Sequence, residues 1–228
     1  MKRIQSVGVD GCCGGWLCFT FDSVRRQITI EVLTDFSSVL REFPEAVLAV
    51  DIPIGLPDRG ARRCDIAARK LIGPRRSSVF PAPIRAMLAA ENYEHACKIG
   101  RATDGRAISR QCFEILPKIR EVDAQLSSEM LHAKVVEIHP EVSFWALSGK
   151  HLAHSKKSSA GRSERLTLLQ RVYPEINQVT FDKKLAQTDD LYDAAVAAWT
   201  AERIVHRAAK AVSGTELDSC GRATQIIY

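Results

Sequence analysis

The amino-acid sequence predicts an α/β fold with a mixed sheet, in which three antiparallel strands are followed by parallel ones. Residues 4–10 form a short apolar run with β-branched valines, which suits a buried strand, and the glycines that follow allow a tight reversal. Residues 46–50 are almost wholly apolar, as in strands that are buried on both faces of a parallel sheet. The two runs lead directly into Asp10 and Asp51, so we expect a sheet whose central strands end in acids.

The segment between these two runs predicts two more strands and a helix. Residues 16–21 are expected to return antiparallel to the first strand, and residues 27–34 alternate as a third. Asp35 is expected to cap a short helix, and this crossover makes the fourth strand parallel to the first. If the first and fourth strands pair, Asp10 and Asp51 lie together at the edge where open α/β sheets bind ligands. The alternative is that each aspartate only accepts hydrogen bonds from turn amides.

Composition limits the class of protein. The chain has 228 residues, of which 46% are hydrophobic and 26% charged, which is typical of a globular domain. The net charge of +5 tolerates an anionic partner without requiring one. No apolar run is long enough to cross a bilayer, and no secretory signal follows the first residues. Seven cysteines without a Cys-x-x-Cys pair favour a reduced, cytoplasmic protein over a disulfide scaffold or a zinc site.

A helical insertion over residues 58–130 is predicted between the fourth strand and a fifth, within a single domain that spans residues 1–228. Its long helix near residues 108–126 is expected to break near Pro117. Basic side chains gather in the first part of the insertion and are followed by two serines. This group can be a solvated helical face, or it can bind phosphates through charge and hydroxyl donors. Its members are Arg59, Arg62, Arg63, Arg69, Lys70, Arg75, Arg76, Ser77 and Ser78.

The fifth strand, residues 134–138, has an acid near its end, Glu137, and is followed by His139. A single histidine in this position is more often a hydrogen-bonded core residue than a ligand. Pro140 is well placed as the first residue of a helix. A polar loop over residues 151–163 comes next and contains two adjacent lysines.

The last long helix begins with several acids. Thr188 or Asp189 is the expected N-cap. Asp190 and Asp193 share one face with Ala194 and other small apolar residues. A carboxylate on a buried face is unfavourable unless a cation or a hydrogen-bond donor meets it. The helix dipole explains Asp190 better than it explains Asp193, so Asp193 is the stronger candidate for a site.

With these motifs the chain resembles the widespread family of predicted ribonuclease H-like nucleases. The resemblance covers nearly the whole chain, and its most specific parts are the arginine-to-SSVF block and the EIHPE block. Cys13 departs from the pattern, because members often have Lys, Arg or Pro there. The matching stretches are GVDGCCGGW (8–16), VDIPIGLP (50–57), RRCDIAARKLIGPRRSSVFPAP (62–83), VVEIHPEVSFWALSG (135–149), SKKSSAGRSER (155–165) and DDLYDAAVAAWTAER (189–203).

This resemblance implies a ribonuclease H-like fold and a metal-dependent nuclease acting on RNA or DNA. Asp10, Asp51, Asp190 and Asp193 would hold two divalent metal ions that orient a water and stabilise the transition state. Glu137 would be an extra acid, either a ligand or a general base. Ligation by oxygen alone suits Mg²⁺ or Mn²⁺. The implied nucleic-acid and phosphate contacts are Arg62, Arg63, Arg76, Ser77, Ser78, Lys118 and Lys157.

Two other functions stay open from the sequence. Actin-like and sugar-kinase-like proteins also begin with a strand, an aspartate and a glycine turn, whose amides hold nucleotide phosphates. They normally need two such domains, and this chain is short for that. The second alternative is a non-catalytic module that binds nucleic acid or a small anion. The number of acids weighs against it, because carboxylates repel phosphate unless metal is bound.

Overall fold

A mixed five-stranded sheet organises the computed structural model, which describes residues 6–126 and 134–228. In chain order the strands are β1 (Ser6–Cys12), β2 (Gly15–Asp22), β3 (Gln27–Leu33), β4 (Val47–Val50) and β5 (Val135–Glu137). They lie side by side in the order β3-β2-β1-β4-β5. The first three are antiparallel, whereas β4 is parallel to both β1 and β5. The predicted mixture of antiparallel and parallel strands is therefore confirmed, as is the pairing of β1 with β4.

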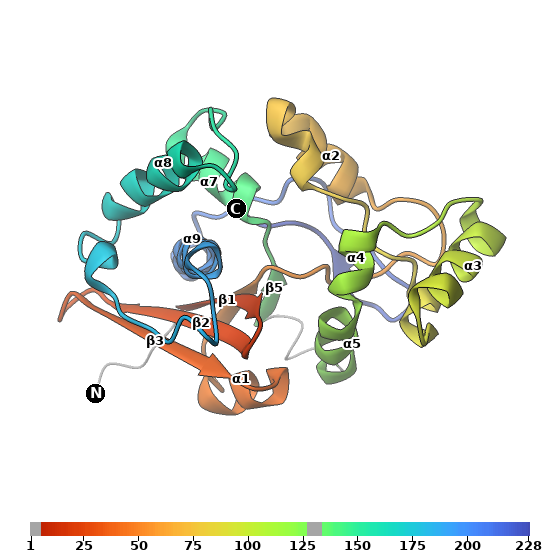
Figure 1. The fold of residues 1–228 in the computed structure, drawn as a ribbon, viewed down its shortest axis with the longest axis horizontal. Helices are drawn as coiled ribbons and strands as arrows, with labels where there is room; N and C mark the ends of the chain where they lie inside the picture. Colours follow the sequence, from red (N-terminus) through yellow and green to blue (C-terminus); the bar gives the residue numbers. More distant parts are fainter. Residues whose placement is uncertain (1–5, 127–133) are drawn as a thin grey trace.

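Helices cover both faces of the sheet (Figure 1). On one face lies α9 (Thr188–Val205), with α7 (Pro140–Ser148) and α8 (Ser159–Gln170) packed beyond it. On the other face lies α1 (Phe36–Glu42), which packs with α5 (Leu116–Gln125). Among the helices of the described residues, none is both long and apolar enough to cross a membrane.

The helix α9 lies unusually close to β1 because Gly8 has no side chain. A Cβ atom at Gly8 would lie 1.9 Å from the carbonyl oxygen of Ala194 and 2.2 Å from the amide nitrogen of Ala198. Ala194 and Ala197 are both fully buried at this contact. The prediction that small residues bring the late helix close to the sheet is confirmed, and this contact fixes where the first turn of α9 meets the end of β1.

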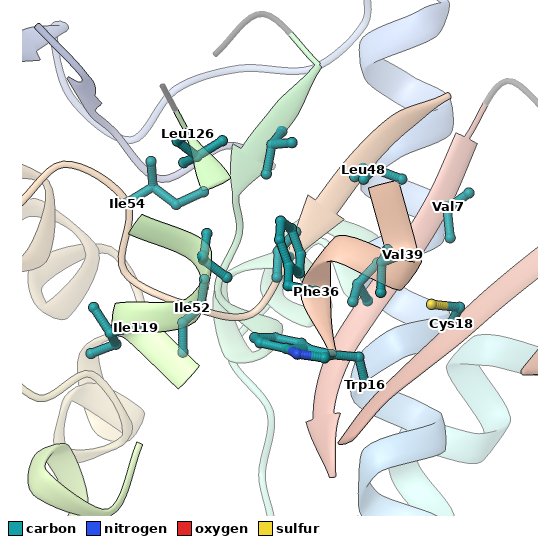
Figure 2. Packing of buried hydrophobic residues seen from close by; sticks show 14 of the residues in the cluster. Val7, Trp16, Cys18, Phe36, Val39, Leu48, Ile52, Ile54, Ile119 and Leu126 are labelled. Atoms are coloured by element: carbon teal, nitrogen blue, oxygen red, sulfur yellow. The ribbon is translucent and has the colours of Figure 1, made fainter. Parts of the chain in front are cut away.

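The core on the α1 face determines which way the strand ends point. Figure 2 shows Trp16, Phe36 and Val39 packed with apolar side chains of β1 and β4. The rings of Trp16 and Phe36 meet edge to face with their centroids 5.1 Å apart. Val9 and Val50 belong to the same cluster. Because side chains alternate along a strand, the residues after Val9 and Val50 are directed toward the α9 face.

The segment between β4 and β5 is helical, as predicted. Its long helix is broken at Ile115, directly before the first turn of α5 that contains Pro117. The segment has a core of its own that includes Met87, Cys97 and Ile108. The expected end of this insertion at residue 130 lies outside the described residues. Besides α5, its elements are α2 (Arg63–Leu71), η1 (Gly73–Ser78), η2 (Arg85–Ala89), α3 (Tyr93–Asp104) and α4 (Arg110–Glu114).

After α9 the chain returns to the open edge of the sheet. Two short strands, β6 (Glu216–Leu217) and β7 (Ala223–Thr224), pair with each other. Beyond them, Ile227 forms a parallel bridge with Ile138, just after β5. The C-terminal segment therefore covers part of the β5 edge, so that this edge is not left unpaired.

Candidate active site at the carboxyl ends of the parallel strands

Asp10 and Asp51 are neighbours where the parallel pairing of β1 with β4 ends: Asp51 directly follows β4, and Asp10 directly follows the last paired residue of β1. Val9 is in register with Val50, and the amide nitrogen of Asp51 donates to the carbonyl oxygen of Val9 at 3.0 Å. Since both valines face the α1 core, both aspartates face α9. Asp10 is only 7% exposed. The adjacency that the sequence predicted is therefore confirmed.

The first two turns of α9 bring two more acids to this edge. Asp193 lies on the face of the helix that is turned toward the sheet and is 3% exposed. Asp190 lies one turn earlier, and its Oδ2 atom accepts a hydrogen bond from the amide nitrogen of Gln187 at 2.7 Å. The prediction that Thr188 or Asp189 caps the helix is wrong, because the helix begins one residue earlier with Gln187 as N-cap. Asp190 thus serves the helix end as well as facing the other acids.

The four acids perturb one another electrostatically. Burial raises the pKa of Asp10 well above its ordinary value, and Asp51, Asp193 and Asp190 raise it further. Burial also raises the pKa of Asp51 to about 8, with Asp193 as the next cause. Like charges held close together in a poorly solvated place disfavour ionisation. The site therefore has a deficit of positive charge, of the kind that a bound cation relieves.

One cation of the chain already reaches these acids. The Nζ atom of Lys156 lies 2.6 Å from Oδ2 of Asp193. Asp193 raises the pKa of Lys156 and outweighs the opposing effect of burial, and Asp51 and Asp10 act in the same direction. From this loop the family resemblance implied Lys157 as a contact, whereas the structure places Lys156 at the acids. No local signal separates two adjacent lysines in a polar loop, because only the fold decides which of them turns inward.

His139 lies beside the same group of residues. Its Nε2 atom is 3.3 Å from the carbonyl oxygen of Ser78, and its Nδ1 atom has no hydrogen-bond partner among the residues that the structure describes. Burial lowers the pKa of His139 to about 4, and the positive charge of Lys156 contributes to this. The imidazole is therefore neutral near pH 7. If Nε2 carries the proton that Ser78 accepts, Nδ1 is left with a free lone pair.

Glu137 does not join the other carboxylates. It is in register with Val50 and therefore shares the α1 face of the sheet, opposite to Asp10. Its Oε1 and Oε2 atoms accept from the guanidinium of Arg62 at 2.7 and 2.6 Å, and Oε2 also accepts from the amide of Ile54 at 2.6 Å. The interpretation of Glu137 as a metal ligand or general base must be revised, since its oxygens are already engaged by the protein.

Arg62 is the cation at the centre of this buried network. It is 4% exposed, and its Nη2 atom also donates to Asp65 at 2.6 Å. Asp65 in turn accepts from the amide of Ala82 at 3.0 Å. The predicted phosphate contact at Arg62 is corrected by this geometry, because a guanidinium enclosed by two carboxylates is not presented to a ligand. Its function is to tie the loop after β4 to α2 and β5.

The remaining predicted phosphate contacts lie in different places. Arg63 is exposed and pairs with Glu216 at 2.9 Å. Arg76 and Ser77 are exposed on η1, and Lys157 is exposed in the loop before α8. The carbonyl oxygen of Ser78 contacts His139. The 3-10 helix η1 therefore connects the exposed Arg76 with the neighbourhood of the acids. Arg76 lines a surface hollow of about 340 Å³ together with Ile66, Arg69, Lys70 and Gly73.

Lys118 lies against the turn that follows Asp10. Its Nζ atom donates to the carbonyl oxygen of Gly15 at 2.6 Å and lies 4.5 Å from the centroid of the Trp16 ring. A Cβ atom at Gly11 would be 2.5 Å from the Cδ atom of Lys118. The side chain thus braces the glycine turn, which holds its ammonium near the edge of the sheet.

A family model described as a protein of unknown function, DUF429, matches residues 8–216. The chain belongs to this family. No curated protein and no solved structure matches the chain. The residues that match the DUF429 model include all four clustered acids, Lys156 and the buried network of Arg62 and Glu137.

The side-chain oxygens of these acids are the type of ligand that a divalent cation prefers. Their present arrangement, however, does not form a metal site. Carboxylate oxygens are hard donors, which Mg²⁺ and Mn²⁺ prefer. Asp193 is engaged by Lys156, and within residues 6–126 and 134–228 no three His, Cys, Asp or Glu side chains are grouped so as to hold a metal ion. The donor set and the excess of negative charge fit a cation, and Asp193 must first leave Lys156.

Proposed function

We propose that this chain is a divalent-metal-dependent nuclease with a ribonuclease H-like fold. The observation that supports it most is the convergence of Asp10, Asp51 and Asp193 from two paired parallel strands and one helix. The antiparallel first three strands, the strand order and the helix across the sheet agree with the fold that the sequence resemblance implies. Function rests on the site, since a fold alone can host many activities.

In this proposal Asp10, Asp51, Asp190 and Asp193 hold Mg²⁺ or Mn²⁺. When bound, the metal ions supply charge neutralisation and an activated water for in-line hydrolysis of a phosphodiester. The four acids differ in their freedom to act. One carboxylate oxygen of Asp190 accepts a hydrogen bond at the N-terminus of α9, whereas Asp10 lies within β1, where its backbone is paired with that of Leu17. The strand-end acids are therefore the rigid part of the donor set, and the helix acids complete it.

Basic side chains beside the acids are proposed to bind the nucleic-acid backbone. The hollow lined by Arg69, Lys70 and Arg76 has three positive residues and no acid among its lining residues. Arginine suits phosphate because its planar group donates two parallel hydrogen bonds. Since η1 connects this hollow to His139, a strand of nucleic acid held there runs toward the acids.

The nucleotide-binding alternative has less support. It requires free amides in the glycine turn between β1 and β2. The amide of Gly14 instead donates to the carbonyl oxygen of Leu185 at 2.8 Å, and Lys118 covers Gly11. The turn is therefore used to join β1 to the segment before α9, and a phosphate would have to displace these contacts.

The experiment is a calorimetric titration with Mn²⁺ and Mg²⁺, followed by a cleavage assay on single-stranded RNA, single-stranded DNA, duplex and branched substrates. Wild type is expected to bind Mn²⁺ and to cut at least one substrate in a metal-dependent way. Asp10→Asn should lose both properties, because it removes a charged ligand without changing size. Asp189→Asn is the control, since it removes an acid at the start of α9 that is not one of the four proposed ligands.

Three results separate the functions. Metal binding with cleavage supports the nuclease. Metal binding that appears only with ATP supports the kinase-like alternative. Absence of metal binding and of cleavage in wild type contradicts the proposal and leaves a non-catalytic binding module.

A further inference from the structure

The two side chains of the Lys156–Asp193 ion pair differ strongly in solvent exposure. The side chain of Asp193 is 5% exposed, whereas that of Lys156 is 41% exposed. The side chain of Lys156 thus extends from the surface to a buried carboxylate. Among the described residues, this is the one ion pair that any of the four clustered acids makes. In the metal-free protein the ammonium therefore offsets part of the negative charge of the acids.

The backbone on the C-terminal side of Lys156 is held by a tight turn. Ser158 caps α8 by accepting from the amide of Gly161 at 3.0 Å, and its hydroxyl donates to the carbonyl oxygen of Ser155 at 2.8 Å. A Cβ atom at Gly161 would lie 1.9 Å from that same oxygen. Only glycine permits this approach, so the turn that presents Lys156 is built into α8.

The backbone on the N-terminal side is held by two charged residues of α8. Glu164 accepts from the amides of Ala153 and His154 at 2.9 and 3.0 Å. Arg165 is 1% exposed, donates to the carbonyl oxygen of His154 at 3.3 Å and pairs with Glu141 of α7. The loop is therefore anchored on both sides of Lys156, while the four-carbon stem of a lysine is intrinsically flexible, so the ammonium can move without the backbone.

We propose that Lys156 is the built-in counter-cation of Asp193 and that a divalent cation binds this site by exchange, displacing the ammonium while the loop backbone stays in place. This inference rests on the proposed function and describes how its site is regulated. A divalent cation on the Asp193 carboxylate and an ammonium 2.6 Å from its Oδ2 atom would repel each other strongly at such short range. The empty acid cluster is stabilised by the lysine, and every metal ion that enters must compete with a cation tethered beside it.

The test is the Mn²⁺ affinity of metal-free wild type, Lys156→Met and Lys157→Met, measured by calorimetry. Methionine keeps the length of the stem and removes the charge. Lys156→Met should bind Mn²⁺ about tenfold more tightly than wild type, because the competitor is gone. In EDTA it should melt at a lower temperature, because Asp193 loses its partner. Lys157→Met removes one charge at the adjacent exposed position and should leave both properties unchanged.

The outcomes separate this inference from the proposed function. If wild type binds Mn²⁺ and Lys156→Met binds it equally or more weakly, the exchange is wrong and the nuclease proposal stands. The same holds if Lys157→Met gains as much affinity as Lys156→Met, since the effect is then one of general charge. If wild type and Lys156→Met both fail to bind Mn²⁺, the proposed function fails and the exchange fails with it.

A second measurement uses only wild type, in case Lys156→Met does not fold. Acetic anhydride labels free amines, and mass spectrometry reports the labelling of each lysine. Saturation with Mn²⁺ should increase the labelling of Lys156 several-fold, because the displaced ammonium is released from its ion pair, and should leave Lys157 unchanged. Unchanged or reduced labelling of Lys156 overturns the exchange.

Discussion

Arg62 donates a hydrogen bond to each carboxylate oxygen of Glu137, with nitrogen–oxygen distances of 2.6 and 2.7 Å. Both side chains are almost fully buried, and Arg62 also donates to the carbonyl oxygen of Ile54 at 3.0 Å. Ile54 lies three residues after Asp51, in the loop that leaves β4. The ion pair therefore fixes the loop that begins at a proposed metal ligand, without belonging to the acid cluster itself.

Arg62→Met is expected to destabilise the protein by about 3–5 kcal/mol, because it leaves Glu137 and Asp65 as buried charges without their partner. Urea unfolding at pH 7 measures this change. Arg63→Met is the control, since Arg63 is 79% exposed in its side chain and makes a surface ion pair. Its effect should stay within about 1 kcal/mol. Equal effects of the two substitutions would contradict a structural function of the buried network.

Gly8→Ala is expected to separate α9 from β1. The added Cβ atom would lie 1.9 Å from the carbonyl oxygen of Ala194, and backbone on both sides leaves little room to adjust. We expect a loss of about 3 kcal/mol or more in unfolding free energy. Circular-dichroism melting checks this, with Gly214→Ala as control because a Cβ atom there meets nothing within 4 Å. A wild-type melting temperature for Gly8→Ala would show that the close contact is absent.

Asp190→Ala is expected to lower stability by about 0.5–2 kcal/mol, because it removes the acceptor for the amide of Gln187 at the start of α9. Asp189→Ala removes a neighbouring acid that does not cap the helix and should be close to neutral. Thermal unfolding in EDTA compares the two. If Asp189→Ala is the more damaging substitution, the helix begins where the sequence predicted and not at Gln187.

The stability of the metal-free protein should fall as pH rises from 6.5 to about 8. Burial raises the pKa of Asp51 to about 8, so the folded state holds a proton that the unfolded state has already released. This contribution is present at low pH and is lost as pH rises through 8. His139 acts in the opposite direction, since its lowered pKa of about 4 makes stability rise with pH, but only up to its unfolded value near 6.5.

Asp51→Asn should therefore flatten the decline above pH 6.5. Urea unfolding in EDTA at pH 6.5, 7.5 and 8.5 measures the slope for both proteins. Some slope remains in the variant, because burial and neighbouring acids also raise the pKa of Asp10. An identical slope in the variant and wild type would mean that Asp51 is not in a shielded, acidic environment.

The sequence by itself determined the elements of the sheet and the position of its acids. Apolar runs, turn glycines and a short helical crossover are local features, and they placed Asp10 and Asp51 at the ends of neighbouring parallel strands. The spacing of Asp190 and Asp193 likewise put both acids on one face of the late helix. These predictions succeeded because strand and helix periodicity depend on residues close together in the chain.

Only the tertiary structure decided which charged side chains turn inward. Lys156 and Lys157 are chemically identical neighbours, as are Arg62 and Arg63, yet one of each pair turns inward to a buried acid, whereas Arg63 makes a surface ion pair. Lys156 meets Asp193 from 37 residues away, and Arg62 meets Glu137 from 75 residues away. The direction of each side chain is set by how the loops are anchored on the folded sheet. Burial then makes the charge depend on a partner that lies far away in the sequence.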